Sequence, residues 1–350
     1  MPPLQEYHRR HAKHLIDHFG YHLPMNYSTL TAEFQASRRA GMTDAGFIGK
    51  IRVTGTDRET LLHRLTTNEM RNMEAGEARV NIFTNAKGRV VDLVQMLAEE
   101  QSYLLLTSPG RAGTLQKWID KYTFIEDVKT VDLTAQLGNI CLVGEECGAK
   151  LAQIASIQLA ELSPGHFSKI YWQEAEILVF RPVANPARFD LITSNDSIPA
   201  LWQELLSEFT PFGFSTQETL RIMQGLPAAD HEIIDDYNPH EIGLYPFVNF
   251  EKGCYIGQEV IARLDSYQKV QRQLIGVKSE TDASQLKDAT IWREQQEIGR
   301  LTSVAPAPPG TGAIGLAVVR KSFAQANTIV ELKRENESFP AILVSLPFHD

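Results

Sequence analysis

The sequence predicts a mixed α+β chain whose last part is a small all-β domain. Up to about residue 209, segments with the two-residue alternation of strands take turns with segments of helical spacing. From Gln273 onward, short strand-like runs are separated by turn residues, which is typical of a small barrel or sandwich. At 350 residues, the chain is long enough for two or three domains.

The first expected element is an amphipathic helix over residues 4–19 that ends near Gly20. This helix would carry four histidines at spacings of three and four residues: His8, His11, His14 and His18. Imidazoles one helical turn apart can chelate a metal ion. The alternative is a half-buried helix face that uses histidine as a polar side chain, and we favour this structural interpretation.

Two strand-like runs over residues 79–84 and 90–97 flank Asn85-Ala86-Lys87-Gly88. This pattern predicts a β-hairpin with glycine where the backbone needs a positive φ. The other expected elements, in order, are strands at 47–53, 103–107, 140–143, 177–183 and 189–193, and helices at 57–65, 111–122, 146–155, 198–209 and 215–224.

Composition excludes several classes of protein. The formal net charge of −9 and a pI near 5.6 argue against broad electrostatic binding to nucleic acid. No apolar run approaches the roughly 20 residues that span a membrane, and the N-terminus lacks the pattern of a secretory signal. Three cysteines without a C-x-x-C pair fit a reducing compartment and no self-contained zinc or iron–sulfur site. We therefore expect a cytoplasmic protein.

The most specific segment is Lys252-Gly253-Cys254-Tyr255-Ile256-Gly257-Gln258-Glu259, which runs into a helix-like stretch. It places Cys254 between two glycines, two residues after Lys252. A cysteine at a helix N-terminus and beside a lysine should have its thiolate stabilised, which makes a thiol reactive or competent to bind a metal. The alternative is a glycine-rich turn that carries a buried, inert cysteine.

These residues also resemble a known signature. K-G-C-Y-x-G-Q-E is similar to the motif of the YgfZ-type folate-binding proteins, relatives of the glycine cleavage T-protein (aminomethyltransferase) that support iron–sulfur protein maturation. Weaker similarities to that superfamily follow in order along the chain at residues 44–55, 65–68, 220–227, 239–243, 298–303 and 315–317.

The resemblance implies a three-lobed, T-protein-like fold with folate bound in a central cavity and a C-terminal β-barrel. The implied domains are a first α+β lobe at 1–137, a second lobe at 138–215 interleaved with it, a connector with the cysteine motif at 216–270, and the barrel at 271–350. The implied cofactor is tetrahydrofolate or a one-carbon derivative.

The resemblance also suggests cofactor-binding residues. Asp190 matches the acidic residue that holds the pterin ring in T-proteins; the alternative is an edge-strand carboxylate that faces water. Arg181 and Arg221 either pair with folate carboxylates or line a polar core. Tyr255 and Gln258 would shape the cysteine loop beside the cofactor.

Asp92 bears on the mechanism. Aminomethyltransferases carry a glycine pair before, and an aspartate pair at, the equivalent hairpin, whereas this chain has Gly88 alone and Val91 before Asp92. Asp92 either points into the cavity or faces solvent on its strand. The departure from the family pattern weakens the aminomethyltransferase interpretation.

Our first hypothesis is a folate-dependent accessory factor for iron–sulfur cluster assembly or repair. Cys254 would be the working thiol, Lys252 would lower its pKa, and iron–sulfur client or assembly proteins would be partners. The alternative is a tetrahydrofolate-dependent one-carbon transferase that acts on an amine or on a modified nucleoside such as one in tRNA, with Asp92 indispensable. A third possibility is a folate-binding protein without chemistry.

Overall fold

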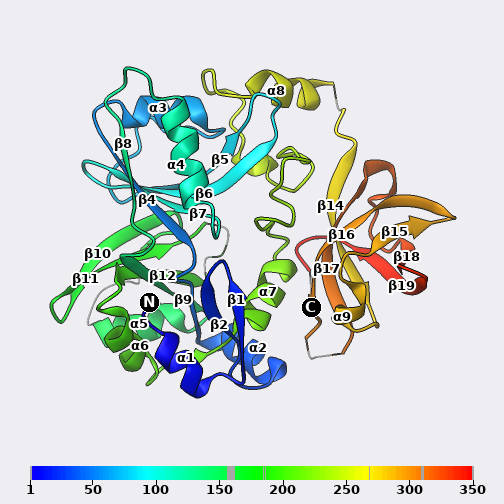
Figure 1. Ribbon diagram of the computed structural model, residues 1–350, viewed down its shortest axis with the longest axis horizontal. Coiled ribbons are helices and arrows are strands. Elements are labelled where there is room, and N and C mark those ends of the chain that lie inside the picture. Colours follow the sequence, from blue (N-terminus) through cyan, green and yellow to red (C-terminus); the bar gives the residue numbers. More distant parts are fainter. Residues whose placement is uncertain are drawn as a thin grey trace. The chain divides into compact units, whose positions relative to one another are not determined.

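The computed structural model describes residues 2–155, 162–183, 185, 187–267, 269–308 and 311–348. The chain forms two compact units, and each unit is made of several segments (Figure 1). The first unit contains residues 1–65, 69–81 and 93–216, and the second contains residues 66–68, 82–92 and 217–350. The division shows that residues 66–68 and 82–92 belong with the C-terminal part of the chain.

A six-stranded sheet is the centre of the first unit. Its strands are β3 (Gly41–Asp44), β9 (Leu137–Val143), β10 (His166–Trp172), β11 (Ala175–Arg181), β12 (Arg188–Ser194) and β13 (Thr210–Pro211). The order across the sheet is β10-β11-β12-β9-β3-β13. β12 therefore lies inside the sheet, paired with β11 on one side and β9 on the other.

A second sheet has the order β5-β6-β7-β4-β8. Its strands are β4 (Gly49–Thr54), β5 (Ala78–Thr84), β6 (Val90–Ala98), β7 (Tyr103–Thr107) and β8 (Lys129–Asp132). The predicted hairpin is confirmed: β5 and β6 flank residues 85–88, and Gly88 has φ +68°. This positive φ is why a glycine occupies the turn.

Two helices, α5 (Cys147–Ala155) and α6 (Ile198–Leu205), pack against one face of the six-stranded sheet. The other helices of this unit are α1 (Gln5–His11), α2 (Leu30–Arg39), α3 (Arg58–Leu65) and α4 (Ala112–Lys121). Ile140 and Leu191 of the sheet pack with Trp202 of α6 in one buried cluster. Because side chains alternate along a strand, Asn139, Cys141 and Asp190 lie on the opposite face. That face carries Phe180 and Ile192, which pack against β6 and β7.

The expected helix over residues 4–19 is wrong in its second half. α1 ends at His11 because Ala12 has an extended backbone, and β1 (His14–His18) then pairs with β2 (Tyr21–Asn26). Phe19 and Gly20 both have positive φ, which closes a tight hairpin. The structural interpretation of the histidines agrees with His8, which is buried and bonded to Asp44 at 2.9 Å. No group of potential metal ligands occurs in the described part of the chain.

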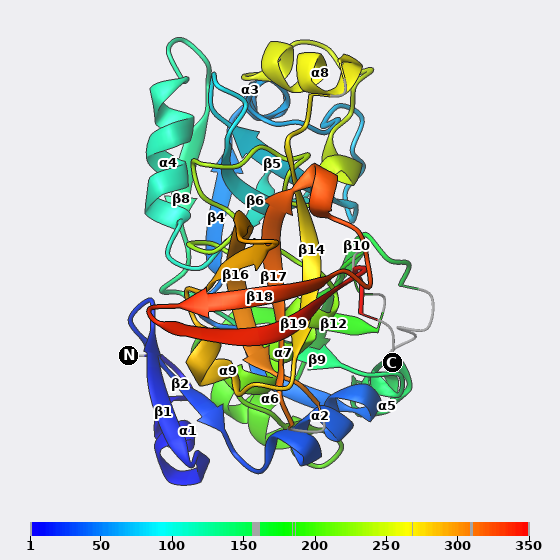
Figure 2. The same ribbon diagram turned by 90° about the vertical axis from the view of Figure 1, so that its right-hand side faces the viewer.

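The second unit ends in a closed six-stranded barrel, which confirms the predicted C-terminal β-barrel (Figure 2). Its strands are β14 (Arg272–Ser279), β15 (Thr290–Arg293), β16 (Gln296–Pro306), β17 (Ala313–Arg320), β18 (Ile329–Arg334) and β19 (Glu337–Val344). The other elements here are α7 (Phe214–Met223), η2 (Tyr245–Phe247), α8 (Gln258–Ser266), α9 (Ala283–Leu286) and η3 (Lys321–Phe323). Among the described residues, no helix has the length and apolar character needed to cross a membrane.

Candidate functional site

Cys254 is exposed on the segment that leads into α8, whereas Cys141 and Cys147 are buried. The expected position at a helix N-terminus needs correction. α8 begins at Gln258, its N-cap is Gly257 with φ +84°, and Cys254 lies in the non-helical segment before that cap. The thiol is therefore presented by a loop, and the first turn of α8 does not contain it.

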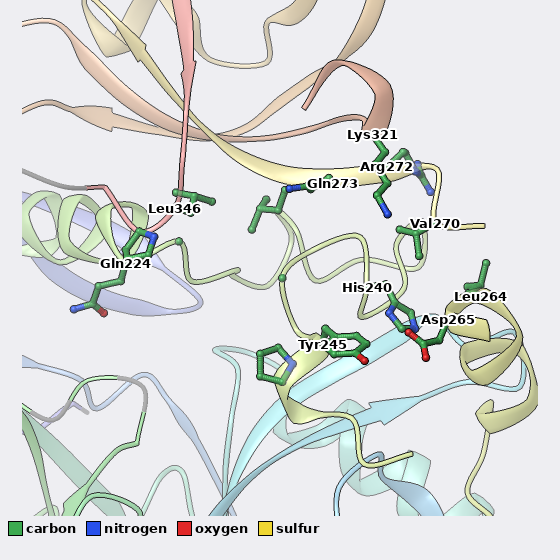
Figure 3. Close-up of a pocket in the computed structure, with 15 residues that line it drawn as sticks. Gln224, His240, Tyr245, Leu264, Asp265, Val270, Arg272, Gln273, Lys321 and Leu346 are labelled. Atoms are coloured by element: carbon green, nitrogen blue, oxygen red, sulfur yellow. The ribbon is translucent and has the colours of Figure 1, made fainter. Parts of the chain in front are cut away.

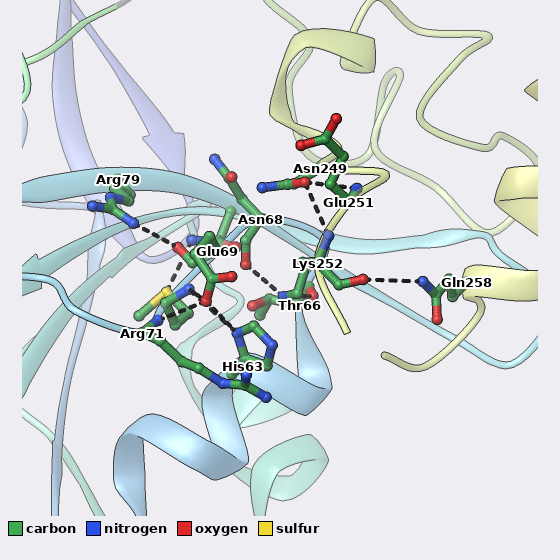
Figure 4. Close-up of polar contacts among 12 residues, drawn as sticks. His63, Thr66, Asn68, Glu69, Arg71, Arg79, Asn249, Glu251, Lys252 and Gln258 are labelled. Atoms are coloured by element: carbon green, nitrogen blue, oxygen red, sulfur yellow. Dashed lines mark hydrogen bonds and ion pairs between the residues drawn. The ribbon is translucent and has the colours of Figure 1, made fainter. Parts of the chain in front are cut away.

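Lys252 anchors this loop from within. Its side chain is buried, and its ammonium donates to the backbone carbonyls of Thr66 at 2.7 Å and Asn68 at 2.5 Å (Figure 4). The same ammonium lies 5.4 Å from the centre of the Tyr255 ring. Lys252 thus ties the cysteine loop to residues 66–68, and its expected effect on the Cys254 thiol stays a prediction.

Other parts of the motif also hold the backbone in place. Thr84 donates its hydroxyl to the carbonyl of Ile256 at 2.5 Å, and the Gln258 amide donates to the carbonyl of Lys252 at 3.4 Å. A Cβ on Gly257 would lie 2.5 Å from the carbonyl oxygen of Asn85, so glycine is required at that contact. The loop therefore rests on the β5–β6 turn.

Tyr255 fills the space beneath the loop. It is buried, and burial raises the pKa of its hydroxyl to about 12. The phenol therefore stays protonated at neutral pH. Of the motif residues from Lys252 to Glu259, Gly253, Cys254 and Glu259 are exposed, whereas Lys252 and Tyr255 are buried and support the loop that carries the thiol.

Asp92 is buried on β6, and its side chain is only 1% exposed. Burial alternates at the start of this strand, so Asp92 shares a face with Val90 and Val94. The solvent-facing alternative for Asp92 is therefore wrong. A buried carboxylate in a strand is a candidate for acid–base or positioning chemistry.

Asp190 is also buried, at 1% exposure, and the water-facing edge-strand alternative is wrong because β12 is an inner strand. Arg188 donates to both carboxylate oxygens of Asp190 at 2.8 Å, which is a bidentate ion pair. Burial is the largest single effect and lowers the pKa of Arg188, but the charge of Asp190, the interaction with Cys141 and the hydrogen bonds to Asp190 together raise it more, so the net shift is upward. The charge of Asp190 is thus already neutralised by Arg188, which lies on the same strand.

Asn139 completes this cluster and was missed in the sequence. Its amide nitrogen donates to Asp190 at 3.1 Å. A carboxylate only accepts, so the amide oxygen must point away from Asp190. That oxygen is buried and has no hydrogen-bond partner among the described residues. The only sequence signal is an asparagine within the otherwise apolar strand β9.

Lys50 is a second residue that the sequence did not single out. It is fully buried on β4, and its ammonium donates to the carbonyl of Gly46 at 2.7 Å. Burial lowers its pKa to about 8, against the opposing effect of the carboxylates of Asp44, Asp190 and Asp132. Asp190 is therefore close to a buried lysine as well as to Arg188.

The two remaining candidate arginines have internal partners. Arg181 donates to the carbonyl of Leu162 at 2.8 Å, and its guanidinium lies over the ring of Phe189. Arg221 pairs with Glu218 at 2.7 Å and also contacts Glu232 and the carbonyl of Leu226. These contacts match the polar-core alternative for both residues, and their role toward folate stays a prediction.

A separate cavity of about 790 Å³ lies within the second unit (Figure 3). It is lined by the end of α7, the segment around η2, the C-terminal end of α8, the start of β14, Lys321, and residues 346 and 347. Lys321, Arg272 and Gln273 lie on one side of it, and His240, Tyr245 and Asp265 on the other (Figure 3). None of these six residues was a site candidate from the sequence.

The fold and the site define a class of protein. An α+β part built on two sheets is followed by a closed β-barrel, and buried carboxylates occur in both units. The GCVT N-terminal domain family matches residues 4–252, and the glycine cleavage T-protein C-terminal barrel domain matches residues 272–350. The chain belongs to the glycine cleavage T-protein family.

Known proteins of this family are similar over nearly the whole chain. An aminomethyltransferase of Chlorobium limicola is 27% identical and covers 99% of this chain and 98% of its own length. A chloroplastic Arabidopsis thaliana protein with a provisional name as a transferase is 28% identical over 88% of this chain and 71% of its own length. The crystal structure of glycine cleavage system aminomethyltransferase T from Bartonella henselae has a TM-score of 0.87.

That crystal structure is 20% identical and covers 99% of this chain and 96% of its own chain, so it shows the fold. Membership in the family supports a folate-type cofactor in general. The two family matches leave residues 253–271 uncovered, which includes Cys254 and α8. The YgfZ-type assignment and the bounds of the four expected domains stay predictions.

Proposed function

We propose that this chain is a folate-dependent accessory protein for iron–sulfur cluster assembly or repair, with Cys254 as its working thiol. The observation that carries the proposal is the presentation of Cys254. One exposed thiol is held by a loop whose neighbouring side chains are buried or bonded to distant backbone. A thiol that must meet a protein client or its cluster needs this kind of exposure.

The other two cysteines are poor candidates for that role. Burial raises the pKa of both Cys141 and Cys147 to about 12, so they are thiols at neutral pH. Only a thiolate is a strong nucleophile or metal ligand. A single working thiol cannot hold a stable cluster alone, because clusters take about four ligands. A partner protein would therefore supply the remaining ligands during transfer or repair.

The polar residues of the first unit fit a folate ring. The pterin head group presents several N–H donors along one edge. Asp190 and Asn139 offer buried acceptors, and the Asn139 amide oxygen has no partner in the described chain. Asp190 and Asn139 would hold the ring, and Arg188 would fix the carboxylate in position. When bound, the folate would supply or accept a one-carbon unit.

The test is rescue of an iron–sulfur enzyme in a host that lacks its own YgfZ-type factor. We expect rescue by the intact chain and by Cys147→Ala, a buried-thiol control, but no rescue by Cys254→Ala or Cys254→Ser at matched expression. Full rescue by Cys254→Ser would remove the thiol from the proposal. Folded protein that never rescues would reject the maturation role.

A second candidate function is a tetrahydrofolate-dependent one-carbon transferase. The burial of Asp92 on β6 favours it, because a carboxylate withdrawn from water can handle a proton or an amine. The relatives named aminomethyltransferase also support it. Under this function Asp92→Asn would abolish activity and Cys254→Ala would retain it, which is the reverse of the first pattern.

A further inference from the structure

The cavity of the second unit carries opposite charges on its two sides, and neither charge is paired among the residues that the structure describes. Asp265 lines one side and Lys321 the other (Figure 3). Among the described residues, neither side chain forms an ion pair or a hydrogen bond; Asp265 is half-buried and Lys321 is exposed. Unpaired charges of opposite sign across a concave site are a recognition pattern for a ligand that carries both signs.

The side with Asp265 is built to receive a cation. Asp265 lies in the last turn of α8, where the helix dipole already concentrates negative potential. His240 donates its Nε2–H to the carbonyl of Ile261 at 3.2 Å, and a carbonyl only accepts, so Nδ1 is left as an acceptor. The ring of Tyr245 lies 5.3 Å from that imidazole and is half exposed, which offers a π face to an ammonium group.

The side with Lys321 is built to receive an anion. Arg272 is held by Glu241 at 2.9 Å and by the carbonyl of Asp236 at 2.7 Å, which leaves its Nη1 without a partner among the described residues. Glu241 is shared between Arg272 and Arg89, whose Nη1 lies 3.4 Å from it, so one carboxylate serves two guanidinium groups and Arg272 is only partly neutralised. Lys321, which is exposed, adds a second positive charge on this side. The Gln273 amide adds neutral N–H donors on the same side (Figure 3).

We propose that this cavity binds a small zwitterion of the amino-acid or short-peptide class. The ligand ammonium would lie against Asp265, His240 and Tyr245, and its carboxylate against Lys321 and the free N–H of Arg272. Leu264, Val270 and Leu346 would contact its apolar part. A phosphate or nucleotide fits less well, because it offers no cation to Asp265.

The size of the cavity favours a short peptide over a free amino acid. About 790 Å³ is within the range of sites for drug-sized molecules and exceeds the volume of one amino acid. We therefore expect a tripeptide to bind more tightly than a free amino acid. The site consists of second-unit residues alone, so the inference does not depend on folate or on Cys254.

The experiment titrates the full chain with Leu-Gly-Gly and with L-leucine by calorimetry. N-acetyl-Leu-Gly-Gly removes the ligand ammonium, and Leu-Gly-Gly-amide removes the carboxylate. We expect each blocked peptide to bind at least about tenfold more weakly than the free peptide. Asp265→Asn should weaken the free peptide by the same factor but leave the affinity for the acetylated peptide unchanged.

Lys321→Gln is the complementary variant, and it should weaken the free peptide but leave the affinity for the amidated peptide unchanged. Lys287→Gln, an exposed lysine outside the cavity lining, is the control and should change nothing. The proposal is overturned if neither probe binds at about 10 mM, if blocked and free peptides bind equally, or if both cavity variants bind like the control.

Discussion

The cysteine loop and the Asp190 cluster differ in the partners of their buried charged side chains. In the loop, the ammonium of Lys252 bonds to backbone carbonyls and Cys254 stays exposed. In the cluster, the charges of Asp190 and Arg188 are paired with each other, and the amide oxygen of Asn139 has no hydrogen-bond partner in the part of the chain that the structure describes. The cysteine loop exposes a thiol, whereas the Asp190 cluster contains a buried amide oxygen that has no hydrogen-bond partner among the described residues.

This difference predicts which substitutions should change stability alone and which should change stability and ligand binding together. Buried charge anchors the backbone in the loop, so removal of the anchor should cost far more than removal of the thiol. In the cluster, the ion pair and the candidate ligand contacts involve the same carboxylate, so stability and binding should change together. Four substitutions test this contrast.

Lys252→Met should have the largest effect. It leaves two carbonyls without their ammonium donor, so we expect the free energy of unfolding to fall by about 3 kcal/mol. Urea unfolding measures the change, and limited proteolysis should show faster cleavage near residue 254. Lys287→Met is the exposed control and should stay within about 0.5 kcal/mol. Equal losses for both variants would contradict the anchoring role.

Arg188→Leu should cost about 2–3 kcal/mol, because it leaves the Asp190 carboxylate buried without its bidentate partner. The arginine side chain is 28% exposed, so water relieves part of the penalty. Arg188→Leu combined with Asp190→Leu should recover at least half of the loss in a double-mutant cycle. Additive losses in the double variant would mean that the two side chains do not act as a pair.

Lys50→Met should change the pH dependence of stability. Burial lowers the pKa of Lys50 to about 8 from a usual value of 10.5, so the folded state releases the proton at lower pH than the unfolded state. Between these values the unfolded chain binds more protons, and stability therefore rises with pH. Relative to Lys50→Met, the wild type should gain at most about 3 kcal/mol from pH 8 to 10.5.

Urea unfolding of both proteins at several pH values measures this difference. Below pH 8 the penalty is fully present, so the wild type should be least stable there relative to Lys50→Met. The facing carboxylates of Asp44, Asp190 and Asp132 are unchanged in both proteins, so they largely cancel in the comparison. A difference that is flat with pH would show that the lysine keeps its ordinary pKa.

Cys254→Ala should have the smallest effect on stability, within about 0.5 kcal/mol, because the side chain is exposed. In the wild type, iodoacetamide should label Cys254 in the folded state, whereas the buried Cys141 and Cys147 should react only after denaturation. Mass spectrometry of the labelled peptides measures this. Rapid native labelling of Cys147 would contradict its burial.

Much of the fold could be predicted from local patterns. The hairpin around residues 85–88 carried both strand alternation and a turn glycine, and the strand at 103–107 has the bounds of β7. The N-terminal hairpin was mistaken for helix because His14 and His18 continue a spacing that His8 and His11 begin. A helix and a hairpin strand can share this spacing over so few residues.

The candidate site was only partly predictable. The motif identified Cys254 and Lys252, but the partners of Lys252 are 186 and 184 residues away in the sequence. Arg188 could have been identified as a partner of Asp190, because residues two apart in a strand lie on the same face. Asn139 could not, since its importance depends on an amide oxygen that none of the described residues satisfies.

The anchoring of Lys252 has a consequence for how the protein is made. The lysine bonds to Thr66, which the ribosome adds 186 residues earlier, so the cysteine loop cannot take its shape in a growing chain that still lacks Lys252. At about 5–20 residues per second, the carbonyls of residues 66 and 68 wait roughly 10–40 s for their donor. The native presentation of Cys254 therefore depends on a contact with a segment of the chain that was synthesised much earlier.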